Sequence, residues 1–463
     1  MTLIKSISGI RGTIGGNPGE GLTPPDIVKF TSAWATWVKT RSIKNKYKVI
    51  IGRDARPSGS MVNKLICGTL VGMGMDIIDV GPSSTPTVEM AVRFEKADGG
   101  IIITASHNPA EWNALKLLNN KGEFLSPEDG EELLAIAEAE KFDFAGISGL
   151  GSYNRGSGFT LKHIDAILSL PLVDVNAIRN RNFKIVTDCV NSVGGLVLPE
   201  LLRLLGVKEV VELYCEPDGL FPHNPEPLPE NLQELSETVV SEKADLGFAV
   251  DPDVDRLAII NEDGTMFGEE YTLVAVADYV LSKNPGNTVS NLSSTRALRD
   301  ITESHGGIHF SSAVGEVNVT SEMKRTGAVI GGEGNGGVIY PALHYGRDAL
   351  VGAALFLTHL AKQGIKCSEL RTRYPDYYLS KNKVVLSPGI DLDAVLSKVK
   401  KHYSGNQLNE IDGLRIDLPG GWVHLRKSNT EPIIRIYSEA TEREKAESLS
   451  SKVIELIRKG QRS

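Results

Sequence analysis

Residues 100–109 read Gly-Ile-Ile-Ile-Thr-Ala-Ser-His-Asn-Pro, an apolar run that ends in polar side chains. The run 100–103 is short, uncharged and rich in β-branched residues, which predicts a buried strand. The Asn-Pro pair that follows favours a turn, and open α/β sheets bind ligands at the ends of their strands. The segment therefore predicts a loop on which Ser106 and His107 face a ligand, with Lys116 following further along the chain.

Three stretches of the sequence share the order of strand, polar turn and helix. Each begins with an apolar strand pattern, continues through a turn of small or polar residues and ends in a helical pattern, over 48–73, 183–205 and 288–305. This is the pattern of a βα unit, and its recurrence predicts three related α/β domains.

The C-terminal part has a different pattern. Short strand patterns and two amphipathic helices alternate there, with strands at 383–386, 413–418, 422–426 and 433–438 and helices at 392–403 and 446–459. This predicts a small α+β domain with antiparallel strands. The chain is therefore expected to have four domains, over 1–152, 153–256, 257–370 and 371–463.

The composition is that of a globular protein, because 41% of the 463 residues are hydrophobic and 23% are charged. The formal net charge of −8, from 58 acidic and 50 basic residues, argues against nucleic acid as the main partner. A local basic pocket for a small anion remains compatible with that charge. No run approaches the roughly 18 consecutive apolar residues of a membrane helix, so we expect no membrane partner.

The cysteines predict free thiols in a reducing compartment. They lie far apart and form no C-x-x-C pair, which argues against a disulfide framework or a zinc site. The four are Cys67, Cys189, Cys215 and Cys367. Residues 1–12 lack the apolar core of a signal peptide, and we therefore expect a cytoplasmic protein.

An acidic segment, Asp-Pro-Asp-Val-Asp-Arg at 251–256, lies between two apolar strand patterns. Carboxylates at every second residue of an extended segment point the same way, and hard oxygen ligands favour Mg²⁺, Mn²⁺ or Ca²⁺. An EF-hand loop is an alternative, because Glu262 stands at the twelfth position from Asp251. However, Arg256 stands where the sharp turn of an EF-hand needs glycine, and strands flank the segment. A solvated acidic turn remains a further alternative.

The neighbouring Ser106 and His107 leave several interpretations open. A hydrolase would use such a pair, but the nucleophile-elbow pattern G-x-S-x-G is missing, and a lone serine is often only a turn or helix cap. A phosphorylated Ser106 would instead bring roughly −1.5 to −2 charges and three acceptor oxygens. With the three aspartates of 251–255, it would complete the oxygen shell of a divalent ion.

A glycine-rich segment, Gly-Gly-Glu-Gly-Asn-Gly-Gly at 331–337, follows another apolar run. Glycine lets the backbone approach a ligand closely, and Glu333 and Asn335 are suited to recognising hydroxyl groups. No Lys-Ser/Thr follows, as a P-loop requires. A flexible hairpin turn is the alternative.

A second polar loop, Arg-Lys-Ser-Asn-Thr-Glu-Pro at 426–432, joins two predicted strands of the last domain. Its cations, hydroxyls, amide and turn amides together favour an anion site. A charged surface turn is the alternative.

In their joint order, these motifs resemble the α-D-phosphohexomutase family, which includes phosphoglucosamine mutases, phosphoglucomutases and phosphomannomutases. The resemblance extends from end to end of the chain. The segments are similar to the family's N-terminal active-site turn, phosphoserine loop, metal loop, sugar loop and phosphate loop, at 8–12, 104–109, 251–256, 333–337 and 426–432. The resemblance implies an α/β fold with four domains around a central cleft, three similar mixed α/β units plus a C-terminal α+β domain.

The resemblance also implies roles for individual residues. Ser106 would carry the phosphoryl group, and His107 would lie beside it. Lys116 would be the general acid and base if cationic neighbours lower its pKa, and Arg11 and Arg256 would support the transfer. The implied Mg²⁺ ligands are Ser106, Asp251, Asp253 and Asp255.

The implied substrate contacts lie in the last two motifs. Glu333 and Asn335 would bind sugar hydroxyls. The phosphate that does not react would be held by Arg426, Ser428, Asn429 and Thr430. The sequence departs from common family patterns at Ala114, where glycine is frequent, at Asn335, where serine is frequent, and at Gly337, where histidine is frequent.

The expected reaction is a Mg²⁺-dependent interconversion of hexose 6-phosphate and hexose 1-phosphate, with a hexose 1,6-bisphosphate as intermediate and activator. Glucosamine phosphate is the expected substrate, and broad phosphomannomutase/phosphoglucomutase specificity is the alternative. A metal-dependent sugar phosphatase and a sugar-phosphate-binding regulator without catalysis are remoter alternatives. The expected partners are small sugar phosphates, and the expected assembly is a monomer or homodimer.

Overall fold

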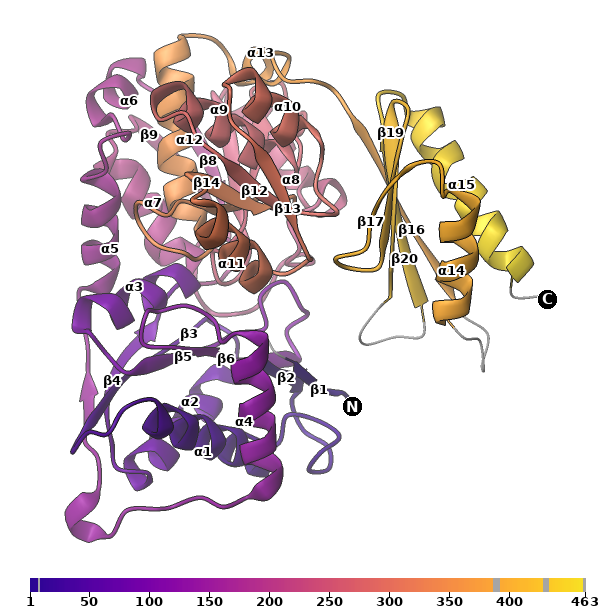
Figure 1. Ribbon diagram of the computed structural model, residues 1–463. Coiled ribbons are helices and arrows are strands. Elements are labelled where there is room, and N and C mark those ends of the chain that lie inside the picture. The colour runs from indigo at the N-terminus through magenta and orange to yellow at the C-terminus, as the bar shows by residue number, and fades with distance from the viewer. Residues whose placement is uncertain (7–8, 386–391, 428–432, 461–463) are drawn as a thin grey trace. The chain divides into compact units, whose positions relative to one another are not determined.

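The computed structural model describes residues 1–6, 9–385, 392–427 and 433–460. Its packing divides into two units, and the elements of both are labelled in Figure 1. The first unit comprises Met1–Thr272 and Asn335–Arg371, and the second comprises Leu273–Gly334 and Thr372–Ser463. The domain boundaries expected from the sequence stay predictions.

The N-terminal part of the first unit is a mixed sheet with helices on both faces. Its strands, in the spatial order β1-β2-β6-β5-β3-β4-β7, are β1 (Leu3–Ser6), β2 (Gly9–Thr13), β3 (Tyr47–Arg53), β4 (Met75–Pro82), β5 (Gly99–Ile103), β6 (Trp112–Leu118) and β7 (Tyr153–Arg155). The helices are α1 (Pro24–Arg41), α2 (Gly59–Gly72), α3 (Thr85–Glu95) and α4 (Pro127–Ala139), followed by the short 3₁₀ turn Ile147–Gly149. Apolar side chains of α1, α2 and α4 cover one face, and those of α3 cover the other.

The remainder of the first unit is built on a second sheet, in the order β11-β10-β8-β9. Its strands are β8 (Lys184–Asp188), β9 (Glu209–Leu213), β10 (Leu246–Val250) and β11 (Leu257–Asn261). The other elements are α5 (Phe159–Leu168), α6 (Val175–Arg181), α7 (Gly194–Leu204), the 3₁₀ turn Pro229–Asn231, α8 (Gln233–Ser241), β15 (Gly337–Ile339), α12 (Ala349–Gln363) and α13 (Cys367–Arg371). Phe356 of α12 packs edge-on against Phe248 of β10, which anchors that helix to the sheet.

The second unit contains a parallel arrangement in which β12 lies between β13 and β14. Its elements are α9 (Tyr271–Lys283), β12 (Thr288–Asn291), α10 (Ala297–Ser304), β13 (His309–Ser312), α11 (Glu316–Thr326) and β14 (Ile330–Glu333). The chain then enters an antiparallel sheet in the order β16-β20-β19-β18-β17, which packs against two helices. These elements are β16 (Tyr378–Val385), α14 (Leu392–His402), β17 (Gln407–Asn409), β18 (Leu414–Leu418), β19 (Gly421–Lys427), β20 (Ile433–Ala440) and α15 (Arg443–Gly460).

Within the described ranges, none of the helices combines the length and the apolar composition that a bilayer span requires. The four cysteines lie in these ranges and are free; three are buried and Cys215 is half-buried.

The helices α3 and α12 of the first unit begin at side-chain caps. Ser84 accepts a hydrogen bond from the amide of Thr87 at the start of α3, where a proline occupies the first turn. Asp348 accepts hydrogen bonds from the amides of Leu350 and Val351 at the start of α12. Such caps satisfy amides that have no partner within the helix, and they fix the residue at which each helix begins.

The replacement Gly99→Ala tests the close packing of β5, the strand that leads to residue 106. A Cβ at Gly99 would lie 2.7 Å from the main-chain oxygen of Leu118 and 2.8 Å from a ring carbon of Trp34. Overpacking of this kind costs about 1–3 kcal/mol, so the melting temperature should fall. The matched control is Gly68→Ala in α2, where a Cβ meets nothing within 4 Å. That change should raise stability by up to about 1 kcal/mol, and equal shifts for the two variants would contradict the packing described.

Candidate active site

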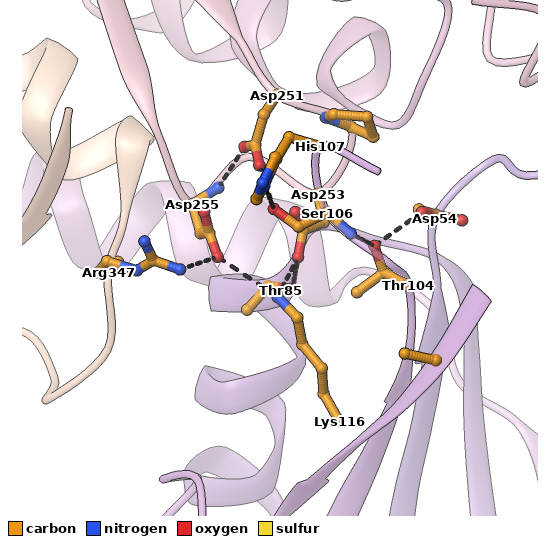
Figure 2. Close-up of polar contacts among 12 residues, drawn as sticks. Asp54, Thr85, Thr104, Ser106, His107, Lys116, Asp251, Asp253, Asp255 and Arg347 are labelled. Carbon is orange, nitrogen blue, oxygen red and sulfur yellow. Dashed lines mark hydrogen bonds and ion pairs between the residues drawn. The ribbon is translucent and has the colours of Figure 1, made fainter. Parts of the chain in front are cut away.

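The loop after β5 holds Ser106 in an unusual backbone conformation. Ser106 is buried and has a φ of +50°, a left-handed conformation that costs a residue other than glycine free energy. Its amide donates to the hydroxyl of Thr104 at 3.0 Å, and that hydroxyl donates to Asp54 Oδ2 at 2.7 Å. These contacts compensate the strain and fix the direction of the Ser106 side chain (Figure 2).

A single buried guanidinium holds this loop together. Arg56 is 1% exposed, and its Nε donates to Asp54 Oδ2 at 3.0 Å. Its terminal nitrogens donate to main-chain oxygens at 2.5–3.0 Å, those of Ser106, Asn108, Pro109 and Trp112. Sequence reasoning missed this residue, although it lies in the polar turn that follows the strand pattern at 48–52. Arginine suits the role because its planar fork carries five N–H donors.

The acidic segment forms the turn between the antiparallel strands β10 and β11. Asp251, Asp253 and Asp255 are fully buried, and each offers an oxygen within 4.8 Å of the others. Asp251 Oδ1 accepts hydrogen bonds from the amides of Asp255 and Arg256, which closes the turn. A solvated acidic turn is therefore the wrong interpretation, and so is an EF-hand, because strands flank the turn.

The phosphoserine loop and the acidic turn meet at one hydrogen bond. Ser106 Oγ donates to Asp251 Oδ2 at 2.7 Å (Figure 2). Burial, reinforced by Asp255 and Asp253, raises the pKa of Asp251 well above its usual range. Among the described residues, Asp253 Oδ1 and Asp255 Oδ1 are buried and have no hydrogen-bond partner. Buried carboxylate oxygens without partners, beside a hydroxyl, fit a hard divalent cation.

Three side chains from other segments bind the remaining oxygens of the turn. Lys116 Nζ lies 2.6 Å from Asp253 Oδ2 and 3.4 Å from Asp255 Oδ2. Arg347 donates to Asp255 Oδ2 at 2.7 Å, and Thr85 donates to Asp253 Oδ2 at 2.5 Å. Sequence reasoning missed Arg347 and Thr85, because nothing in their local sequence marks them.

The condition attached to Lys116, that cationic neighbours lower its pKa, is not met in the unphosphorylated chain. Burial does disfavour the ammonium form, but the carboxylates of Asp253 and Asp255 outweigh burial and raise the pKa above its usual value. Arg347 opposes them only in part. In the unphosphorylated chain, these carboxylates therefore favour the ammonium form of Lys116.

Cations also surround His107, whose Nδ1 lies 3.3 Å from Ser106 Oγ. Burial lowers its pKa to about 2, and the charges of Arg256, Arg347 and Arg11 act in the same direction. Burial and Arg256 likewise lower the pKa of Arg11, which stands opposite Ala114 in the pairing of β2 with β6. The charges of Arg11 and Arg256 thus act on the imidazole that lies beside Ser106, an arrangement that favours an anion.

The residues expected to bind sugar are divided between the two units. Glu333, at the end of β14 in the second unit, is buried, and its Oε1 accepts from Asn291 Nδ2 at 2.9 Å and from the amide of Gly315 at 3.1 Å. Asn335 belongs to the first unit, where its side-chain oxygen accepts from the amide of Gly337 at 3.3 Å.

Of the phosphate loop at 426–432, the structure describes only Arg426 and Lys427, at the end of β19. Arg426 of β19 lies in the second unit, with Nε 2.8 Å from Asp412 Oδ2. In the sheet register it stands directly opposite Arg435 of β20, a second cation that sequence reasoning missed. Like charges placed opposite each other are destabilising, so the pair favours an anion. Ser428, Asn429 and Thr430 lie outside the described residues.

Comparison with known sequences identifies four successive domains, described as phosphoglucomutase/phosphomannomutase alpha/beta/alpha domains I, II and III and the C-terminal domain. They match residues 3–144, 162–264, 268–378 and 383–456. The chain belongs to the phosphoglucomutase/phosphomannomutase family. The expected resemblance and the four-domain α/β fold are thereby confirmed, and the chain is an isomerase-class phosphohexomutase.

Known proteins are similar in sequence or structure to this phosphohexomutase over almost its whole length. A phosphoglucomutase/phosphomannomutase of Thermococcus kodakarensis is 38% identical, over 97% of this chain and 99% of its own length. A phosphoglucosamine/phosphogalactosamine mutase of Sulfurisphaera tokodaii is 32% identical, over 99% of each chain. The crystal structure of a family protein from Burkholderia thailandensis superposes with a TM-score of 0.84 and is 27% identical, covering 99% of this chain and 97% of its own.

Arg56→Met tests whether the buried guanidinium holds the phosphoserine loop. The change removes every contact of Arg56 with the loop and leaves Asp54 buried without its cation, and breaking such a pair costs about 3–5 kcal/mol. We expect faster amide hydrogen exchange at residues 104–112 and loss of activity. The control is Arg203→Met, which removes only exposed ion pairs with Glu200 and Glu212, worth up to about 1 kcal/mol. Unchanged exchange at 104–112 in folded Arg56→Met would contradict this role.

Proposed function

We propose that this phosphohexomutase moves a phosphoryl group between the 6- and 1-positions of a hexose phosphate through phosphorylated Ser106 and a hexose 1,6-bisphosphate. The observation that carries the proposal is the hydrogen bond from Ser106 to Asp251, which places a nucleophilic hydroxyl at a buried acidic turn. A phosphoryl carrier in such a site is shielded from water, which favours return of the group to a sugar over hydrolysis.

We propose Mg²⁺ as the metal ion, held by Ser106, Asp251, Asp253 and Asp255. Asp253 Oδ1 and Asp255 Oδ1, which are buried and have no hydrogen-bond partner among the described residues, support this ligand set. A bound divalent ion would neutralise charge on the transferring phosphoryl group, where most catalysis of phosphoryl transfer arises. Arg256 and Arg11 would add to that neutralisation from the protein side.

We assign Lys116 the role of general acid when the unphosphorylated chain meets the bisphosphate. The bond between phosphorus and the sugar oxygen breaks, a bond between phosphorus and Ser106 Oγ forms, and Lys116 gives a proton to the departing sugar oxygen. The proton of Ser106 has an acceptor in Asp251 Oδ2. In the opposite direction, Lys116 as a free amine takes the proton of the attacking sugar hydroxyl. The carboxylates beside Lys116 favour its ammonium form, which can give up a proton. This form therefore suits the transfer from the bisphosphate to Ser106.

For the substrate, we propose glucosamine phosphate, with broad phosphoglucomutase/phosphomannomutase specificity as the alternative. The relative named a phosphoglucosamine/phosphogalactosamine mutase supports the first, and the 38% identical relative supports the second. Glu333 and Asn335 would bind sugar hydroxyls. The phosphate that does not react would be held by Arg426, Ser428, Asn429 and Thr430. We expect the enzyme to act as a cytoplasmic monomer or homodimer on small molecules.

The decisive test of mechanism is the phosphorylation of Ser106. Incubation with glucose 1,6-bisphosphate should add one phosphoryl group to the chain, measured by intact mass, and peptide mapping should locate it at Ser106. Ser106→Ala should take up none and should lose mutase activity, while keeping its melting temperature within a few degrees. Ser83, which is buried and donates its hydroxyl to the main-chain oxygen of Val80, supplies the control Ser83→Ala. Uptake at another residue would contradict the proposal.

The substrate is tested by a coupled assay with the 6-phosphates of glucosamine, glucose and mannose, in the presence of Mg²⁺ and the matching bisphosphate. Glucosamine 6-phosphate should give the highest kcat/KM, and a chelator should abolish turnover until Mg²⁺ is restored. Comparable values for glucose and mannose would select the broad alternative. Release of inorganic phosphate in place of an isomer would select a phosphatase, and absence of both products would overturn the proposed function.

A further inference from the structure

A second group of buried titratable side chains lies in the first unit, and the mechanism above does not use it. The group consists of Glu89, His163, His344 and Asp348, each between 0% and 4% exposed. They come from separate segments, namely α3, α5 and the stretch that precedes α12. A buried charge is costly in free energy unless it is paired with an opposite charge, so these side chains are expected to pair with one another.

Asp348 is the centre of this cluster. Its Oδ2 lies 3.0 Å from His163 Nε2 and 3.2 Å from His344 Nε2. His163 Nδ1 is hydrogen-bonded to the hydroxyl of Thr87 at 3.0 Å, and His344 Nδ1 lies 3.3 Å from Glu89 Oε2, an ion-pair distance without hydrogen-bond geometry. Burial lowers the pKa of His344, but Asp348 and Glu89 outweigh it and raise the pKa to about 9. His344 is therefore an imidazolium between two carboxylates.

The segment around Asp348 also contacts the acidic turn. Arg347 donates to Asp255 Oδ2 at 2.7 Å, and the amide of Ala349 donates to the main-chain oxygen of Val254 at 3.2 Å. The residues on both sides of Asp348 thus hold the turn, while Asp348 itself is anchored in the cluster. A shift of Asp348 would move both contacts together.

The helix that carries Glu89 contacts the same turn from another side. Thr85, in the first turn of α3, donates its hydroxyl to Asp253 Oδ2 at 2.5 Å and its amide to the main-chain oxygen of Asp253 at 2.9 Å. Glu89 follows one helical turn later. Figure 2 shows Thr85 and Arg347 approaching the acidic turn from different segments. The ion pair between Glu89 and His344 therefore joins the two segments that position Asp253 and Asp255.

We propose that Glu89, His163, His344 and Asp348 are positioning residues that set the separation of the Asp253 and Asp255 carboxylates through Thr85 and Arg347. This role rests on the proposed metal site at Asp251, Asp253 and Asp255. Buried ion pairs contribute little net stability but can fix the register of packed segments. Contacts that orient metal ligands change metal affinity by about 10–100-fold when they are removed.

The same side chains include the ligand types of a zinc site, since His163, His344 and Asp348 offer atoms within 4.8 Å of one another. Direct contacts of 3.0 and 3.2 Å between the imidazole nitrogens and the carboxylate instead favour a hydrogen-bonded cluster. Zinc in the cluster is therefore one of the outcomes that the experiment must separate.

The experiment measures the affinity of the full chain for Mn²⁺ alone by isothermal titration calorimetry, with and without His344→Gln. Glutamine removes the positive charge between Glu89 and Asp348, and we expect the dissociation constant for Mn²⁺ to rise about 10–100-fold. Glu89→Gln together with His344→Gln should weaken binding by less than the product of the two single effects, because both act through one ion pair. Thr87→Val, a milder change that removes the hydroxyl contacting both His163 and the hydroxyl of Ser84, should act in the same direction and remains testable if His344→Gln fails to fold.

The matched control is Leu355→Ala, a fully buried position in α12. It should lower stability by about 2–5 kcal/mol and leave the Mn²⁺ affinity unchanged. Three results would overturn the proposal: a folded His344→Gln chain with the parent's affinity, an equal loss of affinity in Leu355→Ala, or stoichiometric zinc in the purified parent that disappears in His344→Gln. If the parent itself does not bind Mn²⁺, the proposed metal site fails as well, which separates that failure from a failure of the cluster alone.

Discussion

The buried carboxylates of Asp251, Asp253 and Asp255 impose the strongest constraint on this structure. Three acidic groups within 4.8 Å of one another repel, and burial makes that repulsion costly. Lys116 and Arg347 offset part of the negative charge from other segments of the first unit. The compensation is incomplete, because Asp253 Oδ1 and Asp255 Oδ1 have no hydrogen-bond partner among the described residues, and only Arg256 Nε, at 3.8 Å, forms an ion pair with Asp255 Oδ1. The protein alone therefore leaves a site in which a divalent cation would relieve the remaining repulsion.

The second constraint is the backbone at Ser106, and it is met by similar means. The left-handed conformation of this residue would be disfavoured in a free loop. Arg56 binds main-chain oxygens along the loop, and Asp54 holds both Arg56 and Thr104. The buried ion pair of Arg56 and Asp54 thus fixes the direction of the Ser106 hydroxyl. In the same way, the proposed role of the cluster around Asp348 is to orient the carboxylates of Asp253 and Asp255. Both groups of paired charges fix the geometry of the site more than they stabilise the fold.

Local patterns in the sequence predict much of this fold. The strand at 100–103, the βα segments and the antiparallel C-terminal sheet follow from periodicity and turn residues, which act over short distances. The acidic turn between two strands could likewise be predicted, because alternation and flanking apolar runs are visible in the sequence. The same local reasoning places Ser106 at a strand end, where the structure has it.

Contacts between distant segments could not be predicted in this way. Arg56 binds oxygens that lie 50 or more residues further along the chain, and Arg347 binds Asp255 across 92 residues. The sequence does not reveal the direction in which the pKa of Lys116 shifts, because its carboxylate neighbours lie 137 and 139 residues away. Substrate preference likewise depends on contacts between segments that are distant in the sequence. Glu333 already accepts hydrogen bonds from Asn291 and Gly315, and Arg426 is already paired with Asp412. At these proposed binding residues, a sugar phosphate would have to add to these contacts or replace them. The glucose, mannose and glucosamine substrates differ at a single carbon, so their discrimination depends on how well each one meets polar groups that the fold has already oriented.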